Sequence, residues 1–335
     1  MRRFWAVALA SALLSVTAVA GPANACGCGA IAPGVGAVAE VTGENAIVSF
    51  RDGVESIQLS LGVDSAITDA GLIIPTPTPA TVSAGDPALF DAVADQTSPR
   101  KRFVDDWWGT KVATPTIPVE PTVVSRVDVG GLEATTLKAS DSGALAGWLT
   151  QHGYTLSAET SAQLDHYVAK RWYFVAVNLA SEATLDGTLD PIQVSFPTDT
   201  LVYPLAMARA AASEQKLRLN VFGEHRVSLV QAGTAATPLN AAQRTVWAGA
   251  VTSPALTALG PYLTVVDVRL DVPAVQVADD IGIALAPDDT AVDAGLVVVR
   301  PIELLGFPLG TLLTIWLGLG LVGLVGAIIA RRRLR

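Results

Sequence analysis

The first third of the chain places apolar side chains in short runs and alternations that are typical of β-strands. Residues 47–50 and 57–61 flank Asp52-Gly53, a dipeptide that supplies the positive φ angles of a tight hairpin turn. A third strand is predicted over residues 72–74. We expect it to end at Pro75, because proline has no N–H for a β-ladder.

Helix signals follow at three places. Asp86 can cap a helix whose first residue is Pro87, and a second helix is predicted to stop at Gly153. A third helix is predicted to begin after Ser157, with Leu164 on its buried stripe. The last two are consecutive and form a central helical pair.

Strand patterns return in the second half of the chain. They cover residues 172–179 and 192–196, and residues 266–270 alternate as a half-exposed strand would. Residues 217–221 and 227–229 predict a hairpin around a short turn. Strands dominate and no βαβ rhythm occurs, so the expected fold class is α+β, a mainly antiparallel β domain with a central helical pair.

The chain begins like an exported protein. Arg2-Arg3 precedes an uncharged run over residues 4–20, and Ala23-Asn24-Ala25 places small residues where a signal peptidase cuts. We therefore expect residues 1–25 to be a signal peptide. Cys26 would then be the first mature residue, and we expect it to carry no lipid because the residues before it do not form a lipobox.

The other end predicts a membrane anchor. Residues 304–330 carry no charged side chain, and the basic tail 331–335 follows them. The run exceeds the roughly 20 residues that cross a bilayer, and the positive-inside rule keeps the tail in the cytoplasm. We expect a single-pass, type I protein of the cell membrane, with residues 26–303 as an extracytoplasmic domain.

Small residues recur every fourth position in this segment. Gly310, Thr314 and Gly318 would form one stripe along a transmembrane helix, and such stripes permit close approach of two backbones. The stripe predicts a weak homodimer.

Residues 98–122 differ from their surroundings. A basic triplet is followed by Asp105-Asp106-Trp107-Trp108 and then by prolines at intervals of three. This spacing suits an extended connector, either a boundary between two lobes or one long loop, and we favour the loop. Asp105, Asp106, Trp107 and Trp108 are the candidate binding residues, as an exposed recognition loop; the alternative is that the tryptophans pack into the core.

Composition narrows the function. The mean hydropathy of +0.44 agrees with the presence of membrane and targeting segments. The net charge of −9 excludes nucleic acid as a partner, because phosphate binding needs a basic surface. Two cysteines and three histidines make no metal-binding motif, so we expect no metal and no cofactor. Cys26 and Cys28 are a candidate thiol pair.

Other residues carry no catalytic pattern. No Gly-x-Ser-x-Gly string occurs, and no His-Glu-x-x-His links the histidines. His152 is expected to interact with the C-terminal end of its helix. Asp279-Asp280 and Asp288-Asp289 are expected to be solvated acids, because they lack the pattern of a calcium loop.

A series of short motifs stands in a characteristic order along the chain. The motifs are Cys26-Gly27-Cys28-Gly29, Leu72-Ile73-Ile74-Pro75-Thr76-Pro77, Asp86-Pro87-Ala88-Leu89-Phe90, Leu149-Thr150-Gln151-His152-Gly153-Tyr154, Tyr167 to Trp172 with Phe174-Val175-Ala176-Val177, and Leu201-Val202-Tyr203-Pro204-Leu205. Over residues 26–270 the chain resembles the exported bacterial proteins of domain-of-unknown-function family 2330. The resemblance implies an extracytoplasmic domain, often with a C-terminal anchor, and no established activity.

Two functions fit these observations. The first is a non-catalytic envelope domain that binds or scaffolds an envelope protein or polymer. The alternative is an exported hydrolase or thiol-dependent enzyme with dispersed residues. A cleft that holds two or more of His152, His166, Asp165 and Cys28 would favour the enzyme.

Overall fold

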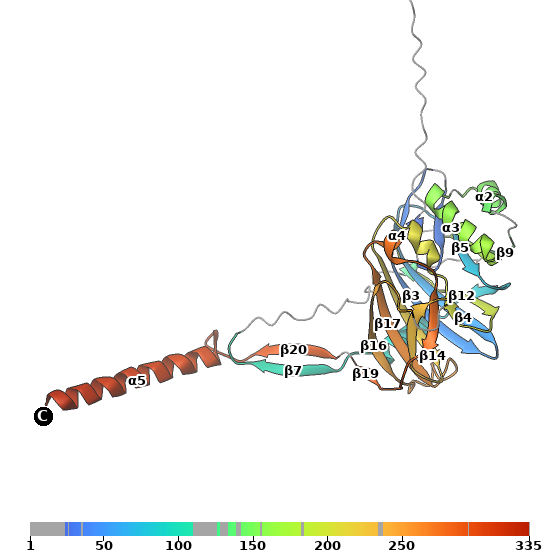
Figure 1. The fold of residues 1–335 in the computed structure, drawn as a ribbon. Helices are drawn as coiled ribbons and strands as arrows, with labels where there is room; N and C mark the ends of the chain where they lie inside the picture. Colours follow the sequence, from blue (N-terminus) through green and yellow to red (C-terminus); the bar gives the residue numbers. More distant parts are fainter. Residues whose placement is uncertain are drawn as a thin grey trace, which may run out of the picture.

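The computed structural model describes residues 24–25, 27–34, 36–109, 126–127, 133–138, 142–154, 156–181, 184–233, 237–293 and 295–334. Figure 1 shows a β-rich head, a two-stranded ribbon and a long terminal helix. We call the ribbon the stalk; it consists of β7 (Lys101–Asp106) and β20 (Leu296–Pro301).

The largest sheet of the head has ten strands. Eight follow the order β19-β16-β17-β14-β3-β4-β11-β8, while β12 pairs with β4 and β6 pairs with β12. The strands are β3 (Ala39–Arg51), β4 (Val54–Ser65), β6 (Thr81–Ala84), β8 (Arg126–Val127), β11 (Gly187–Leu189), β12 (Ile192–Pro197), β14 (Gln215–Gly223), β16 (Ala242–Ala250), β17 (Tyr262–Leu270) and β19 (Val292–Asp293).

Two smaller sheets complete the head. One has the order β1-β2-β5-β10-β9, formed by β1 (Asn24–Ala25), β2 (Ala30–Pro33), β5 (Asp69–Thr76), β10 (Tyr173–Ala180) and β9 (Glu133–Leu137). The other has the order β13-β18-β15, formed by β13 (Val202–Tyr203), β18 (Ile281–Leu285) and β15 (Val227–Gln231). Strand β1 lies inside the predicted signal peptide, so cleavage after Ala25 would remove this edge strand.

Helices α1 and α3 begin where their predicted capping residues place them. The described part of the chain contains six helices. They are α1 (Pro87–Gln96), α2 (Ser142–Gln151), α3 (Ala158–Ala169), the 3-10 helix η1 (Ala206–Ala210), the short α4 (Pro273–Gln276) and α5 (Leu309–Arg333). The Asp86 carboxylate accepts a hydrogen bond from the N–H of Ala88, and the Ser157 hydroxyl accepts one from the N–H of Thr160.

The core is divided among three buried clusters. The largest lies between the sheets of the head and includes Leu59, Val175 and Leu219. A second is covered by α2 and α3 and includes Tyr167, and a third lies beneath α1 around Phe222. The described chain is therefore an α+β protein with mostly antiparallel sheets; three strand pairs, β3–β14, β8–β11 and β7–β20, are parallel.

The predicted hairpin at Asp52-Gly53 is confirmed. Asp52 has φ 53° and Gly53 has φ 77°, and β3 pairs with β4 on either side of them. Strand β5 runs on to Thr76 instead of ending at Pro75. Its partner β2 covers only residues 70–73, whereas β10 stays paired with β5 as far as Thr76 and places Phe174 opposite Pro75.

The predicted hairpin between residues 217–221 and 227–229 is wrong. Strand β14 lies between β3 and β17, whereas β15 pairs with β18 in another sheet. Both edges of β14 are therefore occupied by distant segments, and the short connection after Gly223 leads into a second sheet instead of folding back.

Residues 98–122 do not separate two sets of strands. The ten-stranded sheet combines β3 and β4, which precede this segment, with β11, β12 and β14, which follow it. Within the segment, residues 101–106 form β7 of the stalk, and residues 110–122 lie outside the described residues. The choice between a lobe boundary and one long loop stays a prediction.

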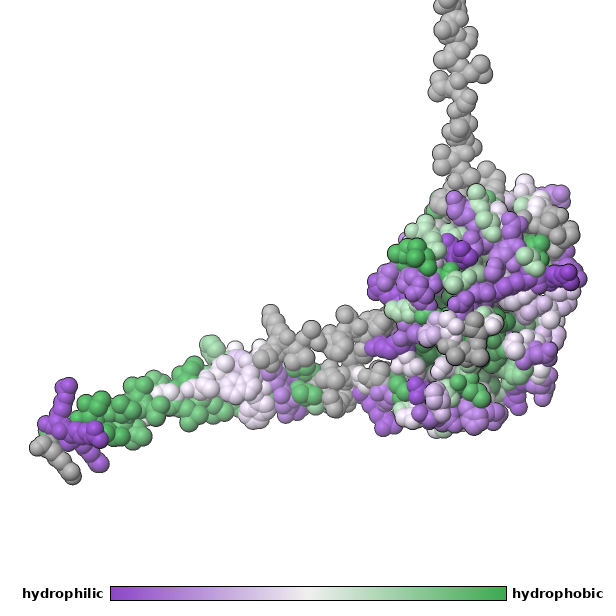
Figure 2. Space-filling view, viewed as in Figure 1, coloured by the Kyte–Doolittle hydropathy of each residue, from purple (hydrophilic) through white to green (hydrophobic). Residues whose placement is uncertain are grey.

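Helix α5 begins at Leu309, five residues later than the start of the predicted apolar segment. Residues 303–308 form a hairpin of β21 (Glu303–Leu304) and β22 (Phe307–Pro308), with Leu305 and Gly306 at positive φ in its turn. The helix has 25 residues and is about 37 Å long, more than the roughly 30 Å of a bilayer core. It is exposed, and Figure 2 shows its apolar surface ending in a hydrophilic tip.

Candidate functional site

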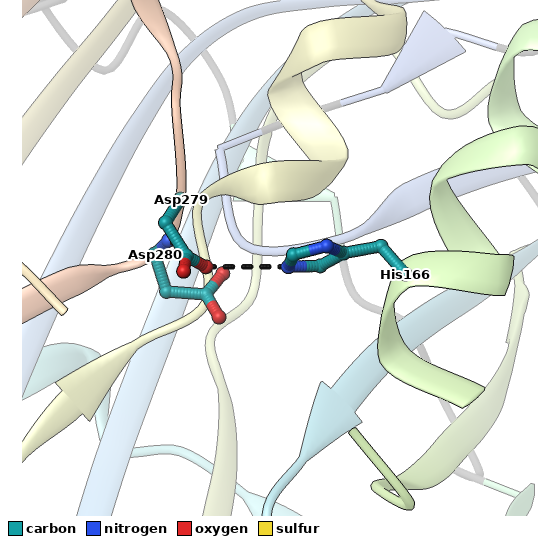
Figure 3. A group of neighbouring side chains, drawn as sticks. All are labelled: His166, Asp279 and Asp280. Atoms are coloured by element: carbon teal, nitrogen blue, oxygen red, sulfur yellow. Dashed lines mark hydrogen bonds and ion pairs between the residues drawn. The ribbon is translucent and has the colours of Figure 1, made fainter. Parts of the chain in front are cut away.

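Titratable side chains converge where α3 meets the start of β18. The α3 end supplies His166, Tyr167 and Lys170, and the opposite side supplies Asp279 and Asp280. We call these five residues the α3–Asp cluster. Residues four apart share one face of a helix, so His166 and Lys170 both reach the acids. Figure 3 shows the His166 ring pointing toward the two carboxylates.

Asp280 is the centre of this cluster and is fully buried. Its carboxylate accepts hydrogen bonds from the Tyr167 hydroxyl at 2.5 Å and from Lys170 Nζ at 2.9 Å. The N–H groups of Leu205 and Ala206 donate to it at 2.9 and 3.0 Å. A buried carboxylate is stable when donors and a counter-ion surround it, and here it joins α3 to the start of η1.

Asp279 is partly exposed beside it. Lys170 Nζ lies 2.5 Å from its carboxylate, and His166 Nε2 lies 3.2 Å from the same oxygen. Burial alone would raise the pKa of Asp279, but the hydrogen bond and charge of Lys170 bring it below its usual value. Burial likewise opposes the charge of Lys170, yet its bonds to both acids raise the pKa of its ammonium.

The cluster contains a donor set that suits a metal ion. One ligand atom each from His166, Asp279 and Asp280 lies within 4.8 Å of the others, and imidazole with carboxylates would suit zinc. However, Lys170 Nζ contacts both carboxylates. One of the two negative charges is therefore already matched by an ammonium of the chain itself, which a metal would have to displace.

Sequence reasoning placed Asp279 and Asp280 among solvated acids, and for Asp280 this is wrong. The apolar neighbours Val277 and Ile281, both buried, were the available signal. For Asp289 the expectation holds, since this exposed side chain lies 2.8 Å from His225 Nδ1 on the surface.

A second buried acid lies beside Cys28. The Glu44 carboxylate accepts hydrogen bonds from the Tyr203 hydroxyl and from the N–H of Cys28. Burial raises the pKa of Glu44, and the bond from Tyr203 opposes that rise only in part. A Cβ on Gly27 would lie 2.9 Å from this carboxylate, so a larger residue there would have to displace the Glu44 side chain. Cys26 lies outside the described residues, and the thiol pair stays a prediction.

A third buried acid, Glu55, has a hydrogen-bond partner for only one of its two carboxyl oxygens. Glu55 Oε2 accepts a hydrogen bond from the N–H of Val202 at 3.1 Å, whereas Oε1 has no partner within the described parts of the chain. Burial raises the pKa of Glu55 to about 8. This carboxyl is therefore largely protonated at neutral pH.

The residues that would favour an enzyme make separate contacts. His152 is exposed, stacks on Trp148 and contacts the Trp148 carbonyl at 2.8 Å, as expected for the end of a helix. Asp165 is exposed and Cys28 is buried. A cavity of about 270 Å³ lies near Arg51 and His225, and none of the four residues lines it.

The candidate binding residues lie at the far end of the stalk. Asp105 forms an ion pair with Arg300 at 2.8 Å, and the Asp106 carboxylate accepts a hydrogen bond from the N–H of Trp108. Trp107 and Trp108 are exposed, so neither packs in the core of the head. The structure places them against the start of α5.

Mostly antiparallel sheets, a buried carboxylate paired with a lysine and a long exposed apolar helix characterise this α+β protein. The chain belongs to the DUF2330 family, described as "Uncharacterized protein conserved in bacteria", which it matches over residues 22–284. This confirms the resemblance seen in the motifs. The match ends before β20 and α5.

Other comparisons add little. No curated protein matches the chain. Among solved structures it is similar to the crystal structure of baculovirus P35, with 8% sequence identity and a TM-score of 0.35 over 73% of this chain and 97% of the other. That likeness is too low to support an argument about function.

Proposed function

We propose that this chain is a membrane-anchored bacterial envelope protein whose head binds or scaffolds another envelope component without catalysing a reaction. Residues 1–25 act as the signal peptide and residues 26–303 lie outside the cytoplasm. Residues 304–330, including α5, form the membrane segment, and residues 331–335 remain in the cytoplasm. The observation that carries this proposal is α5, an apolar helix exposed along its length and held away from the head.

The stalk supports a role at a distance from the membrane. Strands β7 and β20 pair over six residues, which corresponds to about 20 Å at the rise of a strand. The head therefore stands clear of the anchor. The arginines in the last turn of α5 favour an orientation with this end in the cytoplasm.

The chemistry of the head supports binding over catalysis. In the α3–Asp cluster, four donors form hydrogen bonds with the buried Asp280. One of the four is the ammonium of Lys170, which is also its counter-ion. A general acid or base needs a proton that can reach a substrate, and these groups are committed to each other.

Protease protection tests the topology. Trypsin added to wall-stripped cells that express the full chain should degrade the head and leave a fragment that contains α5. A cytoplasmic protein should stay intact in the same sample as a control. Full protection of the head would contradict the proposed orientation.

Crosslinking tests the binding role. A lysine-reactive crosslinker applied to intact cells should join the head to a specific envelope protein or polymer. The matched control is an unrelated exported domain carried on the same stalk and α5. Identical captures by both proteins would show that the anchor alone determines what is found, and the binding role would be rejected.

A further inference from the structure

Large apolar side chains are exposed together at the membrane-proximal end of the stalk. We call Trp107, Trp108, Leu304, Leu305 and Phe307 the collar. Trp107 and Trp108 follow β7, and the other three belong to the β21–β22 hairpin. All five are exposed, from 44% for Trp107 to 88% for Leu305. Five such side chains in one place need an apolar environment to cover them.

The collar is joined to the first turn of α5. The N–H of Gly310 donates a 2.6 Å hydrogen bond to the carbonyl of Trp107. A Cβ on Gly310 would lie 2.7 Å from the Trp108 ring, and a Cβ on Gly109 would lie 2.6 Å from Pro308. Two glycines thus let the end of β7 lie directly on the start of the helix, and the tryptophans flank the point where α5 begins.

The hairpin tip holds a leucine in an unfavourable conformation. Leu305 has φ 55° and is followed by Gly306 at φ 78°. Asparagine, aspartate or glycine normally occupies such a turn, because a positive φ brings the Cβ of other residues too close to the backbone. Nothing in the described chain buries the Leu305 side chain in return. Transfer of that side chain from water into lipid would offset the cost.

Charged side chains become fewer from the stalk toward α5. The ion pair of Asp105 with Arg300 lies on the head side of the tryptophans, Glu303 begins the β21–β22 hairpin, and α5 has no charged residue before Arg331. The collar therefore occupies the boundary between a charged and an apolar region. Tryptophan is enriched at that level of a membrane, because its ring is apolar and its N–H bonds to water or headgroups.

We propose that the collar is a lipid-contact surface embedded in the headgroup and upper acyl region of the outer leaflet. Trp107 and Trp108, which follow β7, thereby make a second contact with the bilayer, beside α5. This inference rests on the proposed membrane anchor, and the experiment must separate the two.

Tryptophan quenching by brominated lipids provides the test. The full chain is reconstituted in phosphatidylcholine vesicles whose acyl chains carry bromine near the headgroup end or near the methyl end. In the W316F background, the tryptophans after the predicted signal peptide are Trp107, Trp108, Trp148, Trp172 and Trp247. Lipid brominated near the headgroups should quench part of the tryptophan emission of the W316F protein. Adding W107F and W108F to that background should abolish this quenching. W172F, which removes a tryptophan of the head, should leave the quenched emission unchanged.

The outcomes distinguish anchor from collar. Trp316 lies seven residues into α5, about 10 Å along it, so bromine near the methyl end should quench the emission that differs between wild type and W316F. Quenching of Trp316 without quenching of Trp107 and Trp108 would overturn the collar and leave the anchor. No quenching of Trp316 would overturn both. If neither brominated lipid nor aqueous acrylamide quenches the collar, protein covers it and the lipid proposal is wrong.

Discussion

The backbone N–H of Gly310 donates a 2.6 Å hydrogen bond to the carbonyl oxygen of Trp107. The first N–H groups of a helix have no partner within the helix, and Pro308 provides no side-chain cap for α5. A carbonyl from the end of β7 therefore caps the start of α5. The stalk and the helix are linked by this contact in addition to the chain itself.

Replacing Gly310 by leucine should open this junction. The added side chain would collide with the Trp107 carbonyl and the Trp108 ring. Loss of one hydrogen bond, about 1 kcal/mol, would raise the opened population about fivefold. Trypsin cleavage after Lys101 and Arg102 in vesicles should accelerate accordingly. Gly318→Leu is the control, because no atom lies within 4 Å of a Cβ there; equal acceleration by both variants would refute the contact.

The homodimer through Gly310, Thr314 and Gly318 stays a prediction. Gly310 is the buried residue of α5 and is covered by Trp107 and Trp108 of the same chain. The stripe is therefore best tested at Gly318. Gly318→Leu should lower a membrane two-hybrid signal, whereas Gly323→Leu should not, because it lies off the four-residue repeat. Equal signals from both variants and wild type would reject the dimer.

Lys170→Met should destabilise the head. Asp280 would keep a buried charge without its counter-ion, at a cost of about 3 kcal/mol. Thermal unfolding followed by circular dichroism measures the change, and Lys216→Met, at an exposed ion pair, serves as control with an effect of about 0.5 kcal/mol or less. Asp280→Asn added to Lys170→Met should recover part of the loss. A double variant as unstable as the sum of both single variants would show that the two charges do not interact.

Zinc should stabilise Lys170→Ala more than the wild type. Without the ammonium, His166, Asp279 and Asp280 retain oxygen and nitrogen ligands within 4.8 Å of one another and carry excess negative charge. Binding to the folded state raises the midpoint of unfolding. Thermal scans with zinc or with chelator measure the difference, and Lys170→Ala/His166→Ala is the control. A larger shift for wild type than for Lys170→Ala would show that Lys170 does not occupy the place of the metal.

Glu55 should make stability fall as the pH rises. Burial raises its pKa in the folded state to about 8 from 4.5, so the folded state holds the proton that the unfolded state has lost. The free energy of unfolding keeps its full value below pH 4.5. It declines as the pH rises to about 8, by on the order of 4 kcal/mol.

Glu55→Gln should flatten this pH dependence, because the amide cannot titrate. Melting curves of both proteins over that pH range measure the effect, and Glu40→Gln, at an exposed position on β3, should retain the slope. Identical slopes in wild type and Glu55→Gln would place the origin of the effect elsewhere.

Local signals in the sequence predicted much of the fold. The turn at Asp52-Gly53 and the caps at Asp86 and Ser157 depend on neighbouring residues, and each occurs as predicted. The hairpin after Gly223 was predicted wrongly because β14 pairs with β3 and β17, which lie far away in the sequence. Hydrophobic alternation identifies a strand but not its partner.

The candidate site was less accessible to sequence reasoning. His166 and Lys170 are separated by more than a hundred residues from Asp279 and Asp280, so the cluster exists only in the folded head. The sequence identified Trp107 and Trp108 as candidates because two acidic residues and two tryptophans are consecutive there. Their position could not be predicted, because it depends on a contact with Gly310 at the other end of the chain.

The parallel arrangement of β7 and β20 has a consequence for shedding of the head. A protease that cuts the peptide bond before Leu296 severs the covalent route from the head to α5 and leaves β20 on the fragment that contains α5. The strand pair and the contact of Trp107 with Gly310 still join the two fragments. Release then waits for a two-stranded ribbon to separate, and such ribbons are only marginally stable in water. The stalk thus turns a single cleavage into delayed rather than immediate loss of the head.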